Sequence, residues 1–451
     1  MTLRDRLATL AVLAAMALAV LDAGMVNIAL PALAKALAVA PARAILAVSA
    51  YQLALVMGLL PAAHLAEAWG YRRLFVAGTV LFSCAALASA LAPTLSLLVA
   101  GRFVQGLGAA AIMALGLALL RATLGRERLG AAIGWNALTV ALCSAAGPAI
   151  GALILSAGLW RGIFLAGLPV AAAALLASRA LPEIAPTRRS IDIASIALYG
   201  GSIALLVFAL ELAPGNPAAA ALLASAALPC FALLVQRERP GQAPFLPFDL
   251  LAIAPFRASV MASICCFMGQ SAGMVALPFY LQVGLGHGPL AAGLVITCWP
   301  MAVAVTGLIA GRATDRFSAA SQCAVGGVLL ASGLLVAALA PARDSVMPLV
   351  AGVLLCGAGF GLFQLANNRS LYLSAPEERG AAAGAMQGTA RLTGQTMGTL
   401  IMSLSFTMAS AAVAPRIGLV AGAAFALAAA GISAAMGMRG NSELNRRESY
   451  P

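Results

Sequence analysis

An aspartate interrupts a long apolar run near the start of the chain. In AVLDAGMVNIALPAL, residues 19–33, Asp22 is the only charged residue. At 1.5 Å per residue it lies roughly 20 Å into an apolar helix, near the middle of a membrane or slightly beyond. A carboxylate there costs at least about 2.5–3.5 kcal/mol, so it should face a water-filled cavity or a partner. We therefore expect Asp22 to exchange protons as access alternates between the two sides. A structural hydrogen bond, for example to Asn27, is the alternative.

One arginine is the expected counterpart of this aspartate. Arg102 lies a few residues inside another apolar run, in GRFVQGLGAA at residues 101–110. Its long side chain can reach inward, which makes Asp22 and Arg102 the predicted proton-coupling residues. The alternative is that the Arg102 guanidinium group extends back to the membrane interface.

Polar residues inside several apolar runs are candidates for a substrate cavity. Amide side chains can form hydrogen bonds with varied compounds, although helix packing explains the pair Asn367 and Asn368 equally well. Arg391 could bind an anionic group of a substrate or pair with a helix end. The predicted cavity residues are Asn27, Gln105, Gln364, Asn367, Asn368 and Arg391.

Two glycines that flank a proline predict a close contact between helices. Gly147 and Gly151 are spaced i,i+4, so both lie on one helix face that a neighbour can approach. Pro148 removes a backbone donor and favours a bend. We expect this segment to seal an outer gate, and ordinary packing of small residues is the alternative.

Short charged loops follow two of the apolar runs, in HLAEAWGYRR at residues 64–73 and GRATDRFS at residues 311–318. Carboxylates and arginines at helix ends can form a charge cluster that favours one conformation, although each exposed pair contributes only about 0–1 kcal/mol. Charge that merely sets topology is the alternative. The predicted gating residues in these loops are Glu67, Gly70, Arg72, Arg73, Asp315 and Arg316.

The composition indicates which elements must position these residues. Of 451 residues, 62% are hydrophobic and only 9% are charged, whereas a soluble protein of this length exposes far more charge. Apolar runs of about 20 residues recur along the chain, each long enough to span a bilayer. We therefore expect an all-α polytopic membrane protein. The net charge of +12 lies in short loops and forms no basic domain, so we expect no nucleic-acid partner.

Charges, prolines and glycines divide the chain into about 14 predicted spans. If the first residues are cytoplasmic, about twenty basic residues fall on that side and about five on the other, a strong positive-inside bias that holds for an even number of spans. We expect both termini in the cytoplasm and the chain in the inner, cytoplasmic membrane. The predicted spans are 8–34, 43–66, 73–93, 96–120, 129–154, 159–180, 191–212, 217–236, 256–283, 289–311, 320–341, 346–370, 380–409 and 414–437.

An internal repeat organises these spans into two halves. GAAIG at 130–134 is repeated as GAAAG at 380–384, and the two charged loops share the same offset of about 250 residues. The repeat advances eight spans while each half supplies six, so two spans are inserted between parallel halves. The predicted regions are a six-helix bundle at 1–185, the inserted helices with linkers at 186–240, a second six-helix bundle at 241–440 and a cytoplasmic tail at 441–451.

Six segments, in order along nearly the whole chain, resemble motifs of the major facilitator superfamily, in particular its fourteen-spanner drug:proton antiporter branch (the EmrB/QacA type). The resemblance implies the fold of that superfamily and a role for the arginine of the fourth span, Arg102, in proton transfer with the first span. The segments are LDAGMVNIALP (21–31), HLAEAWGYRR (64–73), GRFVQGLGAA (101–110), GPAIG (147–151), WRGIFLAGLP (160–169) and LPFYLQVGLGHGPLAAG (277–293).

This chain departs from the family pattern at several positions. Ala63 and Glu67 replace the usual glycine and aspartate, Gly24 replaces threonine and Gly167 replaces a common asparagine. Some drug exporters of the branch carry an acid in the thirteenth span, where this chain offers Gln387, Arg391 and Gln395. These departures bear on the substrate class.

The expected function is export of small lipophilic or amphipathic compounds in exchange for protons, by alternating access. We expect a monomer in the bilayer, powered by the proton gradient without a cofactor or metal. An exporter of one endogenous metabolite is the alternative. An intramembrane enzyme is a remote one, because no cluster of catalytic side chains is evident at bilayer depth.

Overall fold

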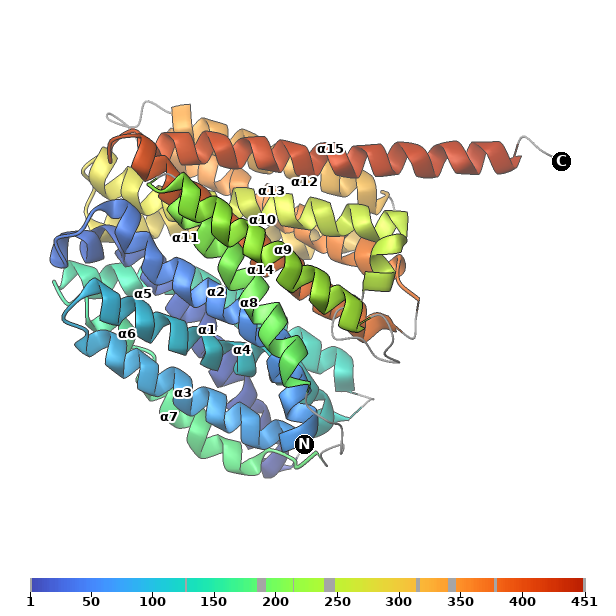
Figure 1. Cartoon of the computed structure of the whole chain (residues 1–451), viewed down its shortest axis with the longest axis horizontal. Coiled ribbons are helices and arrows are strands. Elements are labelled where there is room, and N and C mark those ends of the chain that lie inside the picture. Colours follow the sequence, from blue (N-terminus) through green and yellow to red (C-terminus); the bar gives the residue numbers. More distant parts are fainter. Residues whose placement is uncertain are drawn as a thin grey trace. The chain divides into compact units, whose positions relative to one another are not determined.

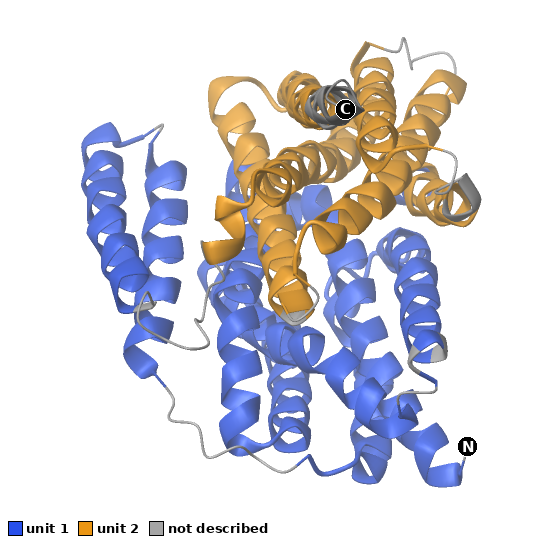
Figure 2. Cartoon of the chain, turned by 90° about the vertical axis from the view of Figure 1, so that its right-hand side faces the viewer, with its two compact units in different colours: residues 1–245, 288–293 blue, residues 246–287, 294–451 orange. Residues whose placement is uncertain are grey.

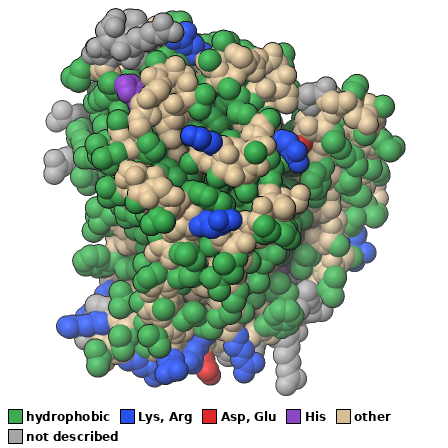
Figure 3. Space-filling model, turned by 90° about the vertical axis from the view of Figure 1, so that its left-hand side faces the viewer, with side chains coloured by type: hydrophobic (Ala, Val, Ile, Leu, Met, Phe, Trp, Pro, Cys, Tyr) green, Lys and Arg blue, Asp and Glu red, His purple; other side chains and the backbone are tan. Residues whose placement is uncertain are grey.

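The computed structural model describes residues 2–125, 128–184, 192–213, 215–238, 248–313, 317–339, 346–376 and 379–448, in which every regular element is helical (Figure 1). Thirteen helices of this part of the chain are long and apolar enough to cross a membrane. Large apolar side chains are exposed on many of them, for example Leu142 and Leu308, and apolar side chains cover much of the face in Figure 3. Exposed apolar surface of this extent is suited to lipid.

The chain forms two compact units, which Figure 2 colours separately. Unit 1 comprises Met1–Phe245 with Gly288–Gly293, and unit 2 comprises Leu246–His287 with Leu294–Pro451. The helices of unit 1 are α1 (Leu3–Ala36), α2 (Pro41–Trp69), α3 (Tyr71–Leu91), α4 (Leu95–Leu124), α5 (Leu129–Ser156), α6 (Gly162–Leu165), α7 (Leu168–Ala177), the 3₁₀-helix η2 (Ser178–Ala180), α8 (Ile193–Leu212) and α9 (Pro217–Glu238).

Local sequence signals set the ends of these helices. Thr2 and Asp5 form a reciprocal capping box at the start of α1, which satisfies backbone N–H groups that the first turn leaves free. A single residue, Gly70, separates α2 from α3 and has a φ of +95°, a conformation that side chains strongly disfavour. Thr94 caps α4 by accepting a hydrogen bond from the backbone N–H of Leu97.

Unit 2 is also a helical bundle. Its helices are η3 (Phe248–Ala252), α10 (Ala254–Phe279), the π-helix η4 (Tyr280–Gly284), most of α11 (Pro289–Ala313), α12 (Ala319–Leu339), α13 (Met347–Leu373), α14 (Gly380–Met408) and α15 (Ala414–Glu448). Glycines allow close approach: a Cβ at Gly326 of α12 would lie 2.6 Å from the backbone nitrogen of Phe363 in α13. The bundle core therefore depends on small residues at helix contacts, as is usual in membranes.

Three elements differ from the sequence-based expectation. The predicted span 159–180 is broken into α6, α7 and η2, because Gly167 and Pro169 interrupt the hydrogen-bond ladder. The predicted span 256–283 ends in a π-helix that begins at Tyr280, two residues after Pro278. This proline again removes a backbone donor. The last helix, α15, continues to Glu448, beyond the predicted end at 437. The predicted span 380–409 corresponds to α14. Its glutamines and Arg391 lower its hydropathy, so it is not one of the thirteen helices counted above.

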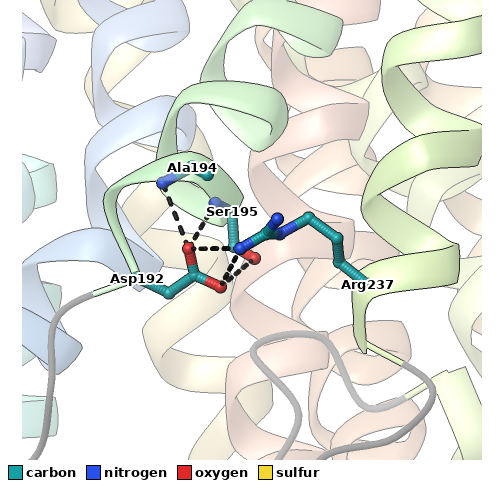
Figure 4. A network of polar contacts seen from close by, with 4 residues as sticks. All are labelled: Asp192, Ala194, Ser195 and Arg237. Atoms are coloured by element: carbon teal, nitrogen blue, oxygen red, sulfur yellow. Dashed lines mark hydrogen bonds and ion pairs between the residues drawn. The ribbon is translucent and has the colours of Figure 1, made fainter.

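The inserted helices α8 and α9 are held together by a polar network at their ends (Figure 4). The carboxylate of Asp192 caps α8 by accepting hydrogen bonds of 3.1 Å from the backbone N–H groups of Ala194 and Ser195. Arg237, in the last turn of α9, donates to the same carboxylate at 3.3 Å. The Tyr199 hydroxyl donates to the Val56 carbonyl oxygen at 3.2 Å, which joins α8 to α2 within unit 1.

Replacing Asp192 with alanine should loosen the start of α8 by about 1 kcal/mol, since the cap is lost together with an exposed ion pair that adds little. Asp192→Asn keeps a capping oxygen and should lose only a few tenths of a kcal/mol. Backbone hydrogen bonding from Ser195 holds the pKa of Asp192 below its ordinary value of 3.8. The stabilisation is therefore present above pH 3.8 and is lost as the pH falls through the lowered pKa.

Hydrogen exchange of the Ala194 and Ser195 amides, corrected for intrinsic rates, measures this opening. Equal protection in the alanine variant and the unchanged chain at neutral pH would show that the network contributes nothing.

Candidate functional site

A closed ring of three polar side chains lies buried inside unit 1. Arg102 Nη1 donates to Asp22 Oδ2 at 2.6 Å and to Gln105 Oε1 at 2.7 Å. Gln105 Nε2 donates to the other carboxylate oxygen, Asp22 Oδ1, at 2.9 Å. The exposed fractions are 3% for Asp22, 1% for Arg102 and 0% for Gln105. The sequence-predicted pair is thus in direct contact, and each carboxylate oxygen accepts a hydrogen bond.

Further groups surround the guanidinium group of Arg102. Its Nε donates to the Ala47 carbonyl oxygen of α2 at 3.2 Å. The ring of Tyr51 lies 4.3 Å from its central carbon and the ring of Phe164 lies 6.0 Å away, within the range of cation–π attraction. The buried cation is therefore compensated by one carboxylate, two further acceptors and an aromatic face.

Helix geometry explains why the ring forms. Arg102 and Gln105 are three residues apart on α4, so their side chains share one face, and α4 packs against both α1 and α2. Gly106 permits the close approach of α2, because a Cβ there would lie 2.8 Å from the Ala54 Cβ. The sequence analysis assigned Gln105 to a substrate cavity, whereas Gln105 binds Asp22. The three-residue spacing from Arg102 was the signal that could have indicated this contact.

A proton on Asp22 would change the hydrogen bonding of the ring. Both carboxylate oxygens accept a hydrogen bond, and a protonated carboxyl group must use one oxygen as a donor. A proton bound on the side of the Arg102 or Gln105 N–H groups would meet another donor, and that hydrogen bond would be lost. Such an arrangement can convert proton uptake into movement of α1 relative to α4.

The contact between α1 and α5 is formed by glycines. A Cβ at Gly147 would lie 3.1 Å from the Gly24 Cα and 3.2 Å from the Leu21 carbonyl oxygen. A Cβ at Gly151 would lie 2.7 Å from Cγ2 of Ile28. A Cβ at Gly24 would lie 3.1 Å from the Gly147 Cα, so a side chain there would push the two helices slightly apart. The predicted close contact at Gly147 and Gly151 is present. Pro148 lies between them, within α5, and its gating role stays a prediction.

Replacing Gly151 with valine is expected to cost about 1–3 kcal/mol of stability, because the added groups overlap Ile28 and the Met25 backbone. Gly134→Ala is the matched control on the same helix, since nothing lies within 4 Å of a Cβ there. That substitution should be neutral or stabilise by up to about 1 kcal/mol through helix propensity. Unfolding of both variants in mild detergent measures the difference, and equal stabilities would contradict the close contact.

One arginine of the charged loop after α2 has partners that the sequence did not indicate, and the predicted gating role of the loop stays a prediction. Arg72 pairs with Glu183 at 3.1 Å and donates to the Arg179 carbonyl oxygen at 3.3 Å, so its partners lie after α7. Glu67 is partly buried near the end of α2, Gly70 forms the turn and Arg73 is exposed. Asp315 and Arg316 lie outside the described residues. Sequence reasoning missed Glu183, which no motif marks.

The remaining predicted cavity residues are distributed over both units. Asn27 is partly buried in unit 1, and its Oδ1 is a buried atom without a hydrogen bond. Gln364, Asn367 and Asn368 lie on α13 of unit 2, where Asn367 is 3% exposed. Arg391 is partly buried on α14, and its Nε lacks a partner. Across the described part of the chain, no three His, Cys, Asp or Glu side chains group as metal ligands.

Comparisons with known proteins agree with this fold. The sequence profile of the Major Facilitator Superfamily matches residues 12–399. The chain is 39% identical to the uncharacterized transporter YebQ of Escherichia coli (strain K12), covering 88% of each sequence. It is 30% identical to the multidrug resistance protein Stp of Mycobacterium tuberculosis (strain CDC 1551 / Oshkosh), covering 88% of this chain and 75% of that protein.

A solved structure supports the same arrangement of helices. The crystal structure of the POT family transporter PepTSo superposes with a TM-score of 0.72 at 14% identity, covering 96% of this chain and 98% of the other. At that identity the likeness concerns the fold alone. The profile match and the similar multidrug resistance proteins show that the chain is a multi-pass membrane transporter of the Major Facilitator Superfamily, in its drug:proton antiporter branch.

Proposed function

We propose that the chain exports small lipophilic or amphipathic compounds in exchange for protons, by alternating access. The observation that carries the proposal is the buried ring of Asp22, Arg102 and Gln105. An ionisable group inside a membrane-spanning helix is costly and is typical of proton pathways. Relatives that are named a multidrug resistance protein and a multidrug efflux pump support the substrate class.

In the proposed cycle, Asp22 binds a proton from one side of the membrane and releases it to the other. Protonation removes the charge that Arg102 compensates, so one hydrogen bond of the ring breaks and α1 is free to shift against α4. Release of the proton restores the ring. Substrate binding favours the deprotonated state of Asp22, so substrate and proton cross the membrane in opposite directions. The proton gradient supplies the free energy for export.

The proposal includes a location and an orientation. The arginine bias of the loops supports the cytoplasmic membrane with both termini in the cytoplasm. The ring is complete within one chain, which supports a monomer as the working unit, with the proton gradient in place of a cofactor.

Transport driven by a pH gradient tests the proposal. Purified chain in liposomes receives a panel of cationic, zwitterionic and neutral lipophilic dyes on the outside, with the interior acidic. Dye should accumulate inside only while the gradient exists, and an ionophore that dissipates it should stop accumulation. Accumulation that ignores the gradient would contradict proton coupling, and no accumulation of any dye would favour export of a single metabolite.

A further inference from the structure

Among the described residues, the partly buried Arg391 has no carboxylate partner, unlike the buried Arg102. It lies within α14, where its Nε is a buried atom without a hydrogen bond. Arg102 and Arg379, by contrast, each pair with a carboxylate. Among the described residues, no acidic side chain pairs with Arg391.

A partly buried guanidinium group without an anion is costly. Arginine does not lose its charge in proteins, and a desolvated charge is tolerated only when it is paired and hydrogen-bonded. The guanidinium group presents a planar fork of donors, which suits an anion with two oxygens.

The polar residues around Arg391 form one face of α14. Gln387 and Gln395 lie one turn before and one turn after it, and all three are partly buried. Amide N–H groups can add donors to an oxygen anion that the guanidinium group holds. This stripe explains why α14, with 29 residues, is less apolar than the helices that qualify as spans.

The position of the stripe is fixed by packing of α14 on α10. A Cβ at Gly394 would lie 2.7 Å from the Phe267 Cβ, and one at Gly398 would lie 2.8 Å from the Ser271 Cβ. Ser271 Oγ donates to the Gln395 backbone oxygen at 2.8 Å. The helix is therefore anchored one turn beyond Arg391, so the cation stands on a rigid element, as a recognition residue requires.

We infer that Arg391 binds the carboxylate, or a chemically similar oxygen anion, of the transported compound. The inference rests on the proposed export function and narrows its substrates to lipophilic compounds that carry an anionic group. With Arg391 as the binding cation in unit 2 and Asp22 as the titrating group in unit 1, substrate recognition and proton exchange use different side chains.

A matched pair of dyes tests this inference. Rhodamine 110 carries a free carboxyl group, and rhodamine 123 is its methyl ester, so the two differ mainly in one negative charge. Fluorescence polarisation of each dye with the purified full-length chain gives its Kd. The unchanged protein should bind rhodamine 110 roughly ten- to hundredfold more tightly, the range expected for a hydrogen-bonded charge pair. Arg391→Gln should abolish that preference, and Arg391→Lys should retain part of it.

Controls separate this inference from a folding defect and from the proposed function. Unchanged binding of rhodamine 123 by Arg391→Gln shows that the variant is folded, and Arg257→Gln, at an exposed arginine of α10, should keep the preference. Asp22→Asn should keep the dye preference while losing proton coupling, so failure of one proposal is distinguishable from failure of the other.

Three outcomes would overturn the inference. They are an equal Kd for the two dyes, binding of neither, or a preference that survives Arg391→Gln. A preference of the unchanged chain that disappears when phosphatidylglycerol is added, while rhodamine 123 binding is unaltered, would assign Arg391 to a lipid phosphate instead.

Discussion

Proteoliposomes that contain the Asp22→Asn variant are expected to release no protons above background when a transported dye is added. Asparagine has nearly the same shape as aspartate and can still accept a hydrogen bond from Arg102, so the ring keeps an approximate geometry. It cannot ionise, however, and therefore cannot carry a proton between the two sides. Transport of dye down its own concentration gradient should continue, because that transport needs no net movement of protons.

The matched control for this variant is Glu211→Gln. Glu211 is another partly buried acid in a membrane-spanning helix of unit 1, on α8, and it takes no part in the ring. A pH-sensitive dye should record normal proton release from this variant. Release that persists in Asp22→Asn would make Asp22 a structural residue and would direct attention to Glu67 and Asp315. Release that is lost only in Glu211→Gln would place proton exchange in the inserted helices.

Replacing Arg102 with glutamine is expected to lower the stability of the protein by about 3–5 kcal/mol, because it leaves the buried charge of Asp22 without its cation. The double variant Asp22→Asn with Arg102→Gln removes both charges and should recover much of that loss. Both variants should fail to couple protons. Arg102→Lys keeps the charge but loses the planar group that binds Asp22, Gln105 and Ala47 together. Its stability should therefore lie between those of the unchanged protein and Arg102→Gln.

A double-mutant cycle gives the interaction energy between Asp22 and Arg102. It compares the free energies of unfolding, in one detergent, of the unchanged protein, Asp22→Asn, Arg102→Gln and the double variant. Additive losses in the single and double variants would show that the ion pair contributes no energy of its own. A stability of Arg102→Gln equal to that of the unchanged protein would show that water enters the site and solvates Asp22.

Much of the fold follows from composition and spacing. Long apolar runs can satisfy their backbone groups inside a membrane only as helices, and the cost of charge at depth singles out Asp22 and Arg102 before any coordinates are known. Their contact could be expected because the long Arg102 side chain can reach inward and because the family resemblance links the arginine of the fourth span to the first span. The close approach of α5 to α1 at Gly147 and Gly151 was predictable for a similar reason, since small residues at i,i+4 have few other uses.

Other features depend on contacts that a sequence does not display. The sequence does not show that Gln105 contacts Asp22, because this depends on how α4 is oriented against α1. In the same way, the position of the Tyr51 ring over Arg102 depends on the packing of α2. The pairing of Arg72 with Glu183 joins residues 111 positions apart, at an exposed site where no burial cost constrains the choice of partner. The breaks at Gly167 and Pro278 were visible as residue types, but their effect depends on local packing.

Infrared difference spectroscopy tests the central claim most directly, because it observes the protonation of a carboxyl group. Addition of a transported dye to the purified protein in lipid should diminish the carbonyl stretch of a protonated carboxylic acid. That signal should be present in Glu211→Gln and absent in Asp22→Asn. A dye-dependent carboxyl signal that survives in Asp22→Asn, or no such signal in the unchanged protein while transport proceeds, would contradict the assignment of Asp22 as the proton carrier.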